Sequence, residues 1–274
     1  MRKRVFFVVF TTLLACAMLL PAAAGGYSGE DFAGNNETML FAVDTPGALS
    51  SETSLGSAVA DAARFASGAD IAIVNGGNFC ANLPGGGIHY SDCLSVFAED
   101  RDLATVLISP SELKELLETG VSRVVITKEE YIDHENSEFE GFPQISGFTF
   151  MYDLSAPVGE RIVWIKMDGK KLDLQSTAAD ITLCATDHML SGGWGYPVHP
   201  AQPTGYTLST ALFEYIQESG TLKTSGTLRI QTRGSNESHL FAILEVSPWM
   251  LLLAVICFAA VGGYKLKPFY DFGR

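Results

Sequence analysis

Three consecutive residues, Asn75, Gly76 and Gly77, form the part of the sequence best suited to hold a small ligand. They follow a continuous apolar run at 71–74, which is typical of a buried strand entering a turn. The asparagine amide can both donate and accept a hydrogen bond, and glycine has no side chain to keep a ligand away from the backbone. These residue types predict a turn that binds a ligand.

Residues that could hold a metal or act as nucleophiles form no known motif. The five histidines are scattered, and the runs 133–135 (Asp-His-Glu) and 187–188 (Asp-His) place neighbours side by side, where they seldom converge on one ion. The sequence has no C-x-x-C zinc motif, no Gly-x-Ser-x-Gly elbow, and no Lys-Ser/Thr pair after the glycines at 85–87. We therefore expect no metal site, no cofactor and no catalytic residue in this chain.

Local signals predict three helices around these residues. Apolar residues recur at helical spacing over 55–66, and Gly68 closes that helix. Ser109, Pro110 and Glu112 form the capping-box arrangement that begins a second helix, although the pattern leaves its C-terminal end open. A third helix is expected over about 208–218, where apolar residues again lie on one side.

Extended patterns lie in four segments: 71–74, 103–108, 148–154 and 161–167. Asp168-Gly169 is a two-residue hairpin turn leading into 170–172, and a last strand is expected over 226–231. Because helices, strands and hairpins alternate irregularly, the sequence predicts an α+β fold, a mixed β-sheet with flanking helices. One domain at about 51–232 would contain all of these elements.

Six short phrases, in a fixed order, connect this domain with a known family. They are Leu55-Gly56, Asn75-Gly76-Gly77, Ile-His-Tyr-Ser-Asp at 88–92, Glu-Leu-Lys at 112–114, Gln-Ile-Ser-Gly at 144–147 and Gly-Gly-Trp-Gly-Tyr at 192–196. Through these phrases the sequence from about 54 to 231 resembles the C-terminal, substrate-recognition domain of the 5′-nucleotidase family. The resemblance implies the fold of that domain and a nucleoside or nucleotide as ligand.

The resemblance also implies where such a ligand binds. In the family two aromatic rings enclose the base; Tyr196 holds the place of the second ring, whereas Glu99 stands where the first is expected. Trp194 replaces the aspartate of the Gly-Gly-Asp-Gly phrase, and Cys80 replaces an arginine that holds the charged part of the ligand. The candidate ligand-binding residues are Asn75, Gly76, Gly77, Glu99, Trp194 and Tyr196. Because Glu99 and Asp100 add negative charge, we expect uncharged nucleosides to bind better than nucleotides.

The family hydrolyses its substrates with a two-metal phosphatase domain. The Asp-x-His and Gly-Asn-His-Glu phrases of that domain are absent from this sequence. The resemblance therefore implies a binding or partner-docking module in nucleotide catabolism, with a separate metallophosphatase chain as candidate partner. Two alternatives stay open: a degenerate structural or interaction domain without a ligand, and a hydrolase of nucleotides by family membership.

The charge balance excludes one class of partner. The chain has 31 acidic and 18 basic residues, a formal net charge of −13. So acidic a surface repels nucleic acid, and no cluster of Lys and Arg could follow a phosphate backbone. We therefore expect no nucleic-acid binding.

Both ends of the chain predict export to a membrane. Residues 1–24 combine a basic start, an apolar stretch and small residues, which is typical of a signal peptide. Residues 248–264 are uncharged and mostly apolar, which predicts a transmembrane helix with lysines on its cytoplasmic flank. Segments 25–50, 233–247 and 265–274 would then be a polar linker, a stalk and a cytoplasmic tail. We expect a single-pass protein of the cell membrane whose domain lies on the extracellular side.

Three cysteines, Cys80, Cys93 and Cys184, fall within the expected exported domain. An odd number permits at most one disulfide within a monomer. Cys80 and Cys93 could form it, or they could simply be buried apolar residues.

Overall fold

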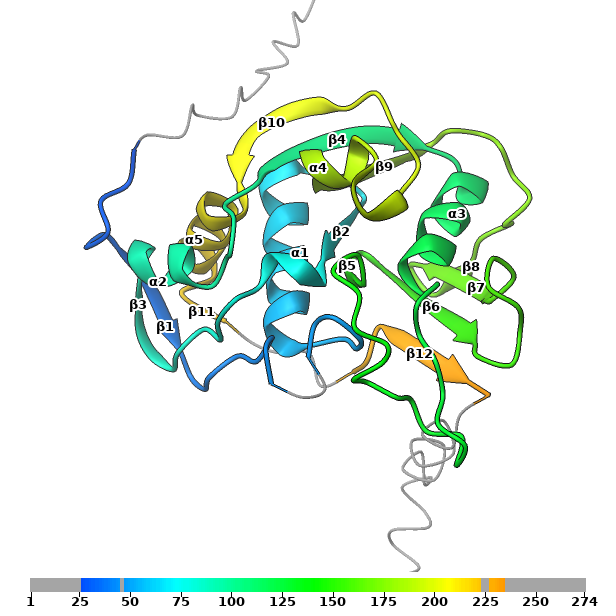
Figure 1. The fold of residues 1–274 in the computed structure, drawn as a ribbon. Helices are drawn as coiled ribbons and strands as arrows, with labels where there is room; N and C mark the ends of the chain where they lie inside the picture. The colour runs from blue at the N-terminus through cyan, green and yellow to red at the C-terminus, as the bar shows by residue number, and fades with distance from the viewer. Residues whose placement is uncertain (1–25, 45–46, 223–226, 235–274) are drawn as a thin grey trace, which may run out of the picture.

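The computed structural model describes residues 26–44, 47–222 and 227–234, and it has a five-stranded mixed sheet at its centre (Figure 1). The strand order is β10-β4-β9-β2-β5. These strands are β2 (Ile71–Asn75), β4 (Asp102–Ile108), β5 (Pro143–Ser146), β9 (Ile181–Thr186) and β10 (Gln202–Thr207). Within it β2 and β9 run parallel, and the other neighbours run antiparallel.

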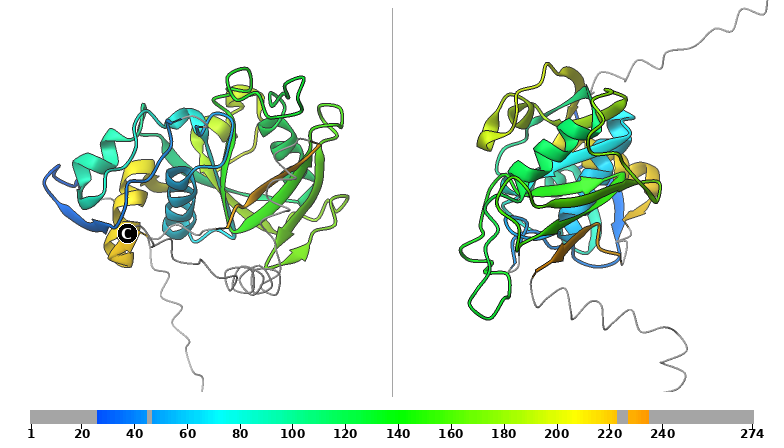
Figure 2. Two further views of the ribbon diagram at one scale, coloured as in Figure 1. Left: turned by 90° about the horizontal axis from the view of Figure 1, so that it is seen from below. Right: turned by 90° about the vertical axis from the view of Figure 1, so that its right-hand side faces the viewer.

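Two smaller sheets lie at opposite ends of the molecule, as the left view of Figure 2 shows. The first has the order β11-β1-β3, from β1 (Phe32–Asn36), β3 (Gly86–His89) and β11 (Thr221–Leu222). The second has the order β12-β6-β7-β8, from β6 (Phe148–Asp153), β7 (Ile162–Met167), β8 (Lys170–Lys171) and β12 (Ile230–Arg233).

The central sheet is buried on both faces because helices cover each side of it. The helices are α1 (Ser54–Ser67), α2 (Tyr90–Ser95), α3 (Pro110–Gly120), α4 (Asp187–Leu190) and α5 (Leu208–Ser219), with 3₁₀ turns at Gly76–Asn78 and Gly193–Gly195. Alternate residues of a strand point to opposite faces. Ala72 and Val74 accordingly join the core under α1 and α5, whereas Ile71 and Ile73 join the core shared with α3 and the β6–β7 hairpin.

The local helix signals are confirmed at the end of α1 and at the start of α3. Thr53 caps the start of α1, and Gly68 ends it in the left-handed conformation, at φ 66°. The capping box of α3 is formed: the Ser109 hydroxyl accepts from the Glu112 N–H, and the Glu112 carboxylate accepts from the Ser109 N–H. These contacts hold the pKa of Glu112 below its usual range. The sequence left the end of α3 open, and the structure ends it at Gly120.

The predicted hairpin is confirmed, while two segments differ from expectation. Met167 pairs with Lys170 across the Asp168-Gly169 turn, in which both residues have positive φ. The last strand is Ile230–Arg233 rather than 226–231, and it pairs parallel with β6. Residues 26–44 and 47–50 are not a linker, because β1 pairs with β3 and β11, and Leu40 is buried in the core.

The described residues contain no helix long and apolar enough to cross a membrane. The longest, α1, has 14 residues, about 21 Å at 1.5 Å per residue, against a hydrocarbon core of about 30 Å. The structure therefore corrects the expected fold class: it shows the α+β domain, and no membrane-spanning helix in the described ranges. The segments 1–24, 248–264 and 265–274, assigned to signal, span and tail, lie outside the described residues.

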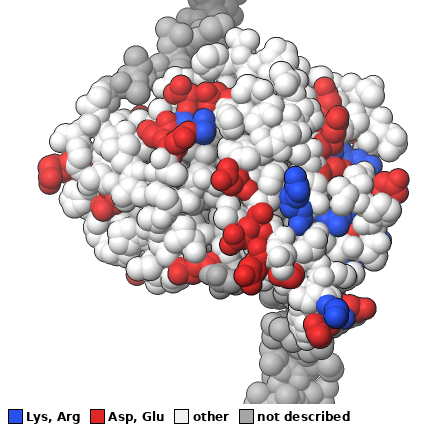
Figure 3. All heavy atoms as spheres, viewed as in Figure 1, with Lys and Arg blue, Asp and Glu red and all other residues white. Residues whose placement is uncertain are grey.

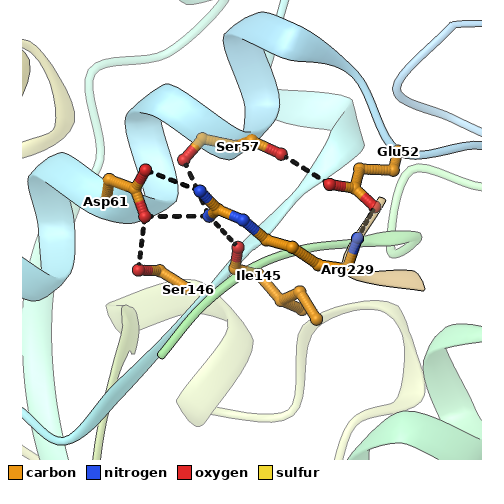
Figure 4. A network of polar contacts seen from close by, with 6 residues as sticks. All are labelled: Glu52, Ser57, Asp61, Ile145, Ser146 and Arg229. Atoms are coloured by element: carbon orange, nitrogen blue, oxygen red, sulfur yellow. Dashed lines mark hydrogen bonds and ion pairs between the residues drawn. The ribbon is translucent and has the colours of Figure 1, made fainter. Parts of the chain in front are cut away.

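A polar network ties the C-terminal strand to α1 (Figure 4). The Arg229 guanidinium forms two bonds to the Asp61 carboxylate, at 2.8 and 2.7 Å, and donates to the Ile145 carbonyl at 2.7 Å. The Glu52 carboxylate accepts from the backbone N–H groups of Arg229 and Ile230, at 2.7 and 2.8 Å. Burial alone would lower the pKa of Arg229, but Asp61 outweighs it and the pKa is raised. Every charged group of this network therefore has a partner.

Candidate functional site

The predicted turn after β2 is present in the structure, and its polar groups form hydrogen bonds within the protein. Asn75 is 0 % exposed; its amide donates to the Glu140 carbonyl at 3.1 Å and accepts from Asn78 at 2.7 Å. A Cβ on Gly76 would lie 1.9 Å from the Ala48 carbonyl oxygen, and the backbone N–H of Gly77 donates to the Glu140 carbonyl. Both glycines thus allow protein segments, rather than a ligand, to approach closely.

Trp194 lies next to this turn and has the most unusual backbone conformation of the site. Its φ is 54°, in the left-handed region that bulky residues rarely adopt. The indole N–H donates to the Glu140 carboxylate at 2.8 Å, and the His188 ring meets the indole edge-on with centroids 4.4 Å apart. The ring is only partly buried. The protein therefore holds a half-exposed aromatic ring in a strained but fixed position.

Tyr196 does not offer the stacking face that the resemblance implies. It is 3 % exposed, and its hydroxyl donates to the Gly141 carbonyl at 2.6 Å. Gly120 at the end of α3 leaves room for this hydroxyl, since a Cβ there would lie 2.8 Å from it. Burial raises the pKa of Tyr196 well above its ordinary value. The exposed ring of the Gly-Gly-Trp-Gly-Tyr phrase is Trp194.

The two acidic residues expected to repel phosphate each have a partner. Glu99 forms an ion pair with Arg101, whose guanidinium carbon lies 6.0 Å from the Trp194 ring centroid. The Asp100 carboxylate accepts from the Ser209 N–H at 2.8 Å and from the Ser209 hydroxyl at 2.6 Å, at the start of α5. The structure therefore brings Glu99 to Trp194 through Arg101, but it removes the unpaired acidic charge on which the nucleoside preference depended.

A cavity of about 640 Å³ opens beside Trp194, along the face of α3. Its apolar lining is Phe139, Val158, Leu174 and Trp194, and its charged lining is Lys114, Glu115, Glu118 and Arg123. Glu118 is satisfied internally, since its carboxylate accepts from the N–H groups of Arg161 and Ile162. Figure 3 shows most of the basic groups of this face in its right half, near α3, among scattered acidic ones. The volume is that of an ordinary small-molecule site.

The sequence did not indicate Glu140, Arg101 or the cavity. Glu140 joins Trp194 to the turn after β2, because its side chain binds the indole and its carbonyl accepts from Asn75 and Gly77. Glu140 lies in the polar segment before β5, and no sequence motif near it indicates a functional role. A half-exposed tryptophan between three glycines was the one signal that could have directed attention to this place.

Metal and thiol chemistry have no assembled site in the part of the chain that the structure describes. No three His, Cys, Asp or Glu side chains there are placed to hold a metal ion. The described cysteines are all free: Cys80 is exposed, whereas Cys93 and Cys184 are buried. Burial raises the pKa of Cys93 to about 12 and that of Cys184 to about 11. Cys80 and Cys93 therefore form no disulfide here, and Cys93 behaves as a buried apolar residue.

The family model for the 5′-nucleotidase C-terminal domain matches residues 35–200, more than half of the chain. The chain belongs to this family. The resemblance read from the six sequence phrases is thereby confirmed, and the chain belongs to a family of nucleotide metabolism.

Individual relatives agree with the family. The trifunctional nucleotide phosphoesterase protein YfkN of Bacillus subtilis is 31% identical over 173 residues, which are 61% of this chain and 11% of YfkN. A 5′-nucleotidase precursor from Thermus thermophilus shares the fold with a TM-score of 0.63 and 22% identity, over 74% of this chain and 39% of that one. The NAD nucleotidase of Haemophilus influenzae also shares the fold, with a TM-score of 0.55 and 13% identity. The match covers 77% of this chain and 37% of that one. The chain thus spans well under half the length of each of these relatives.

Proposed function

We propose that this domain recognises a nucleoside-like ligand in the cavity beside α3, by stacking the base on Trp194. Membership of the 5′-nucleotidase C-terminal domain family supports the ligand class, and the half-exposed, fixed ring of Trp194 supports the place. The turn of Asn75, Gly76 and Gly77 then acts as the support of the site rather than its contact surface.

The single observation that carries this proposal is the left-handed backbone of Trp194. A bulky residue in this conformation costs about 1–3 kcal/mol, which persists only where the surrounding structure over-determines it. Glu140 binds the indole N–H and the His188 ring packs against the indole, so that an incoming base finds a preorganised ring. The lysine and arginine of the cavity balance its two glutamates in formal charge, so a phosphate on the ligand should change the affinity little.

Calorimetric titration tests the proposal on the purified protein. Adenosine, AMP and inorganic phosphate are titrated into the wild type, Trp194→Ala and Trp164→Ala. Trp164 is the matched control, a partly exposed tryptophan on strand β7. Loss of stacking on one face costs about 1–3 kcal/mol, so Trp194→Ala should bind adenosine about 5- to 150-fold more weakly. Trp164→Ala should bind like the wild type.

Three outcomes would contradict the proposal. Absence of binding by every nucleoside and nucleotide would favour the alternative of a structural domain without a ligand. Equal losses in both tryptophan variants would place the ligand elsewhere. Tight binding of inorganic phosphate alone would mean that the cations, rather than the ring, define the site.

Catalysis and location are separate proposals. We propose that a separate metallophosphatase chain hydrolyses the phosphate ester of a nucleotide that this domain recognises, and that the signal-like residues 1–24 export the domain. Phosphate release from AMP by the purified chain with Mg²⁺, Mn²⁺ or Zn²⁺, lost on mutation of its own acidic residues, would contradict the first proposal. Recovery of the domain only from the cytoplasmic fraction of cells would contradict the second.

A further inference from the structure

The outer face of the β12-β6-β7-β8 sheet carries two lysines that are direct partners, although the chain as a whole is acidic. Lys166 and Lys171 are direct partners across the β7–β8 ladder, and Lys170 precedes Lys171 beside the hairpin turn. Lys170 and Lys171 are exposed, and Lys166 is partly exposed. We call Lys166, Lys171 and the adjacent Trp164 the lysine face; Lys170 pairs with Met167 and so belongs to the opposite face of the hairpin.

The register of the sheet sets a cationic row beside an apolar row. Thr149, Lys166 and Lys171 are successive partners across β6, β7 and β8. Met151 and Trp164 form the next row on the same face, about 7 Å away along the strands. The Lys166 ammonium lies 4.4 Å from the centroid of the Trp164 ring, which confirms that the two side chains share a face.

The lysines of this row have no ion-pair partner among the described residues, and the repulsion between them lowers the stability of the folded domain. Like charges directly opposite each other in a ladder are destabilising. Neither Lys166 nor Lys171 forms an ion pair with another described residue, although the chain has 31 acidic residues against 18 basic ones. Arg233 at the end of β12, by contrast, is paired with Asp153 at 2.7 Å. The lysine face therefore keeps its positive charge, whereas the positive charge of Arg233 in the same sheet is neutralised by Asp153.

We propose that the lysine face docks an acidic polypeptide segment of a partner protein, with acidic side chains on Lys166 and Lys171 and an apolar side chain on Trp164 and Met151. The row spacing of about 7 Å equals two residues of an extended peptide, so one strand can satisfy both rows. The net charge of −13 repels extended polyanions and anionic bilayers. A short segment meets mainly the local field, because charges farther than about 8 Å are screened at physiological salt. The proposal is independent of the Trp194 cavity.

Fluorescence anisotropy of a labelled peptide, Glu-Glu-Phe-Glu-Glu-Phe-Glu-Glu, tests this inference with the full chain. We expect salt-sensitive binding, weaker at about 500 mM than at about 50 mM NaCl. The double variant Lys166→Gln/Lys171→Gln and the single variant Trp164→Ala should each weaken it by about tenfold or more. Lys128→Gln, on an exposed loop, should leave it within about twofold, as a matched control for one lost charge. The same peptide with Gln in place of Glu should not bind.

Lys171→Glu adds a second readout in which stability and binding move in opposite directions. A glutamate opposite Lys166 replaces like charges with an ion pair, so the Tm should rise by about 1–3 °C while peptide binding is lost. Failure of the acidic peptide to bind better than its Gln version overturns the proposal. So does undiminished binding by the lysine double variant, or tighter binding to heparin or to phosphatidylserine vesicles than to the peptide.

Discussion

Two charged regions of this molecule, the Arg229 network and the surroundings of Trp194, use similar side chains in opposite ways. At Arg229 the guanidinium bonds to the Asp61 carboxylate, and the Glu52 carboxylate accepts from the backbone N–H groups of Arg229 and Ile230. Beside Trp194 the cavity contains Lys114 and Arg123 with no ion pair to a described residue, and an aromatic ring open to solvent.

This difference indicates which of the two regions can bind a ligand. A fully satisfied network has no capacity left for a ligand, and its energy goes into holding β12 against α1. The indole N–H of Trp194 is bound to Glu140, but Lys114 and Arg123 beside the ring form no ion pair with a described residue and keep their bonding capacity for a ligand. The comparison therefore assigns a structural role to Arg229 and a binding role to Trp194, and each assignment predicts a different variant phenotype.

The largest effect is expected from Arg229→Ala. This change leaves the Asp61 carboxylate without its partner and the Ile145 carbonyl without a donor. Breaking a fully buried pair costs about 3–5 kcal/mol. Because Arg229 and Asp61 side chains keep 16% and 26% exposure, we expect a loss of about 2–4 kcal/mol in the free energy of unfolding. Urea denaturation measures it, with Arg123→Ala expected to change the value by less than about 0.5 kcal/mol.

Asn75→Ala is expected to be the next most damaging change, and it sharpens the comparison within the site. The alanine leaves the buried Asn78 amide without its acceptor and removes one of the two donors to the Glu140 carbonyl. We expect a loss of about 1–3 kcal/mol in stability, measured by urea denaturation. The exposed Asn136→Ala serves as control. A stable Asn75→Ala protein that has lost ligand binding would show that Asn75 contacts the ligand after all.

Trp194 is expected to respond to glycine and alanine in an unusual order. Both changes remove the ring, but glycine adopts a φ of 54° without strain. Trp194→Gly should therefore be about 0.5–1 kcal/mol more stable than Trp194→Ala. At Trp164, in the extended strand β7, the order should reverse. If alanine is the more stable substitute at both tryptophans, the backbone strain at Trp194 is not real.

The smallest effect concerns two buried thiols, Cys93 and Cys184, in the core under α1 and α5. Burial raises the pKa of Cys93 to about 12 and of Cys184 to about 11, against 9.0 ordinarily. The unfolded chain therefore releases these protons first, and stability falls as the pH rises from about 9 toward 12. Between pH 7.5 and 9 we expect a loss of about half a kcal/mol for each thiol. The double variant Cys93→Ala/Cys184→Ala should lose less over this interval, as urea denaturation at both pH values can show.

Much of the local structure was determined by the sequence alone. Gly68 ends α1, Ser109 and Glu112 begin α3, and Asp168-Gly169 turns the β7–β8 hairpin, since each signal acts within a few residues of itself. The six ordered phrases likewise identified the family without reference to any contact. The described ranges contain no membrane-spanning helix, and the segment 248–264, for which hydropathy predicted one, lies outside them.

The tertiary structure alone decided which of the predicted site residues face outward. Composition cannot show that Tyr196 turns inward to Gly141 while Trp194 stays accessible, because the left-handed backbone and the space at Gly120 set their directions. Nor can it pair Arg229 with Asp61, 168 residues apart, or bring β1 into a sheet with β11. Such contacts depend on the folded path of the whole chain, whereas caps and turns depend only on near neighbours.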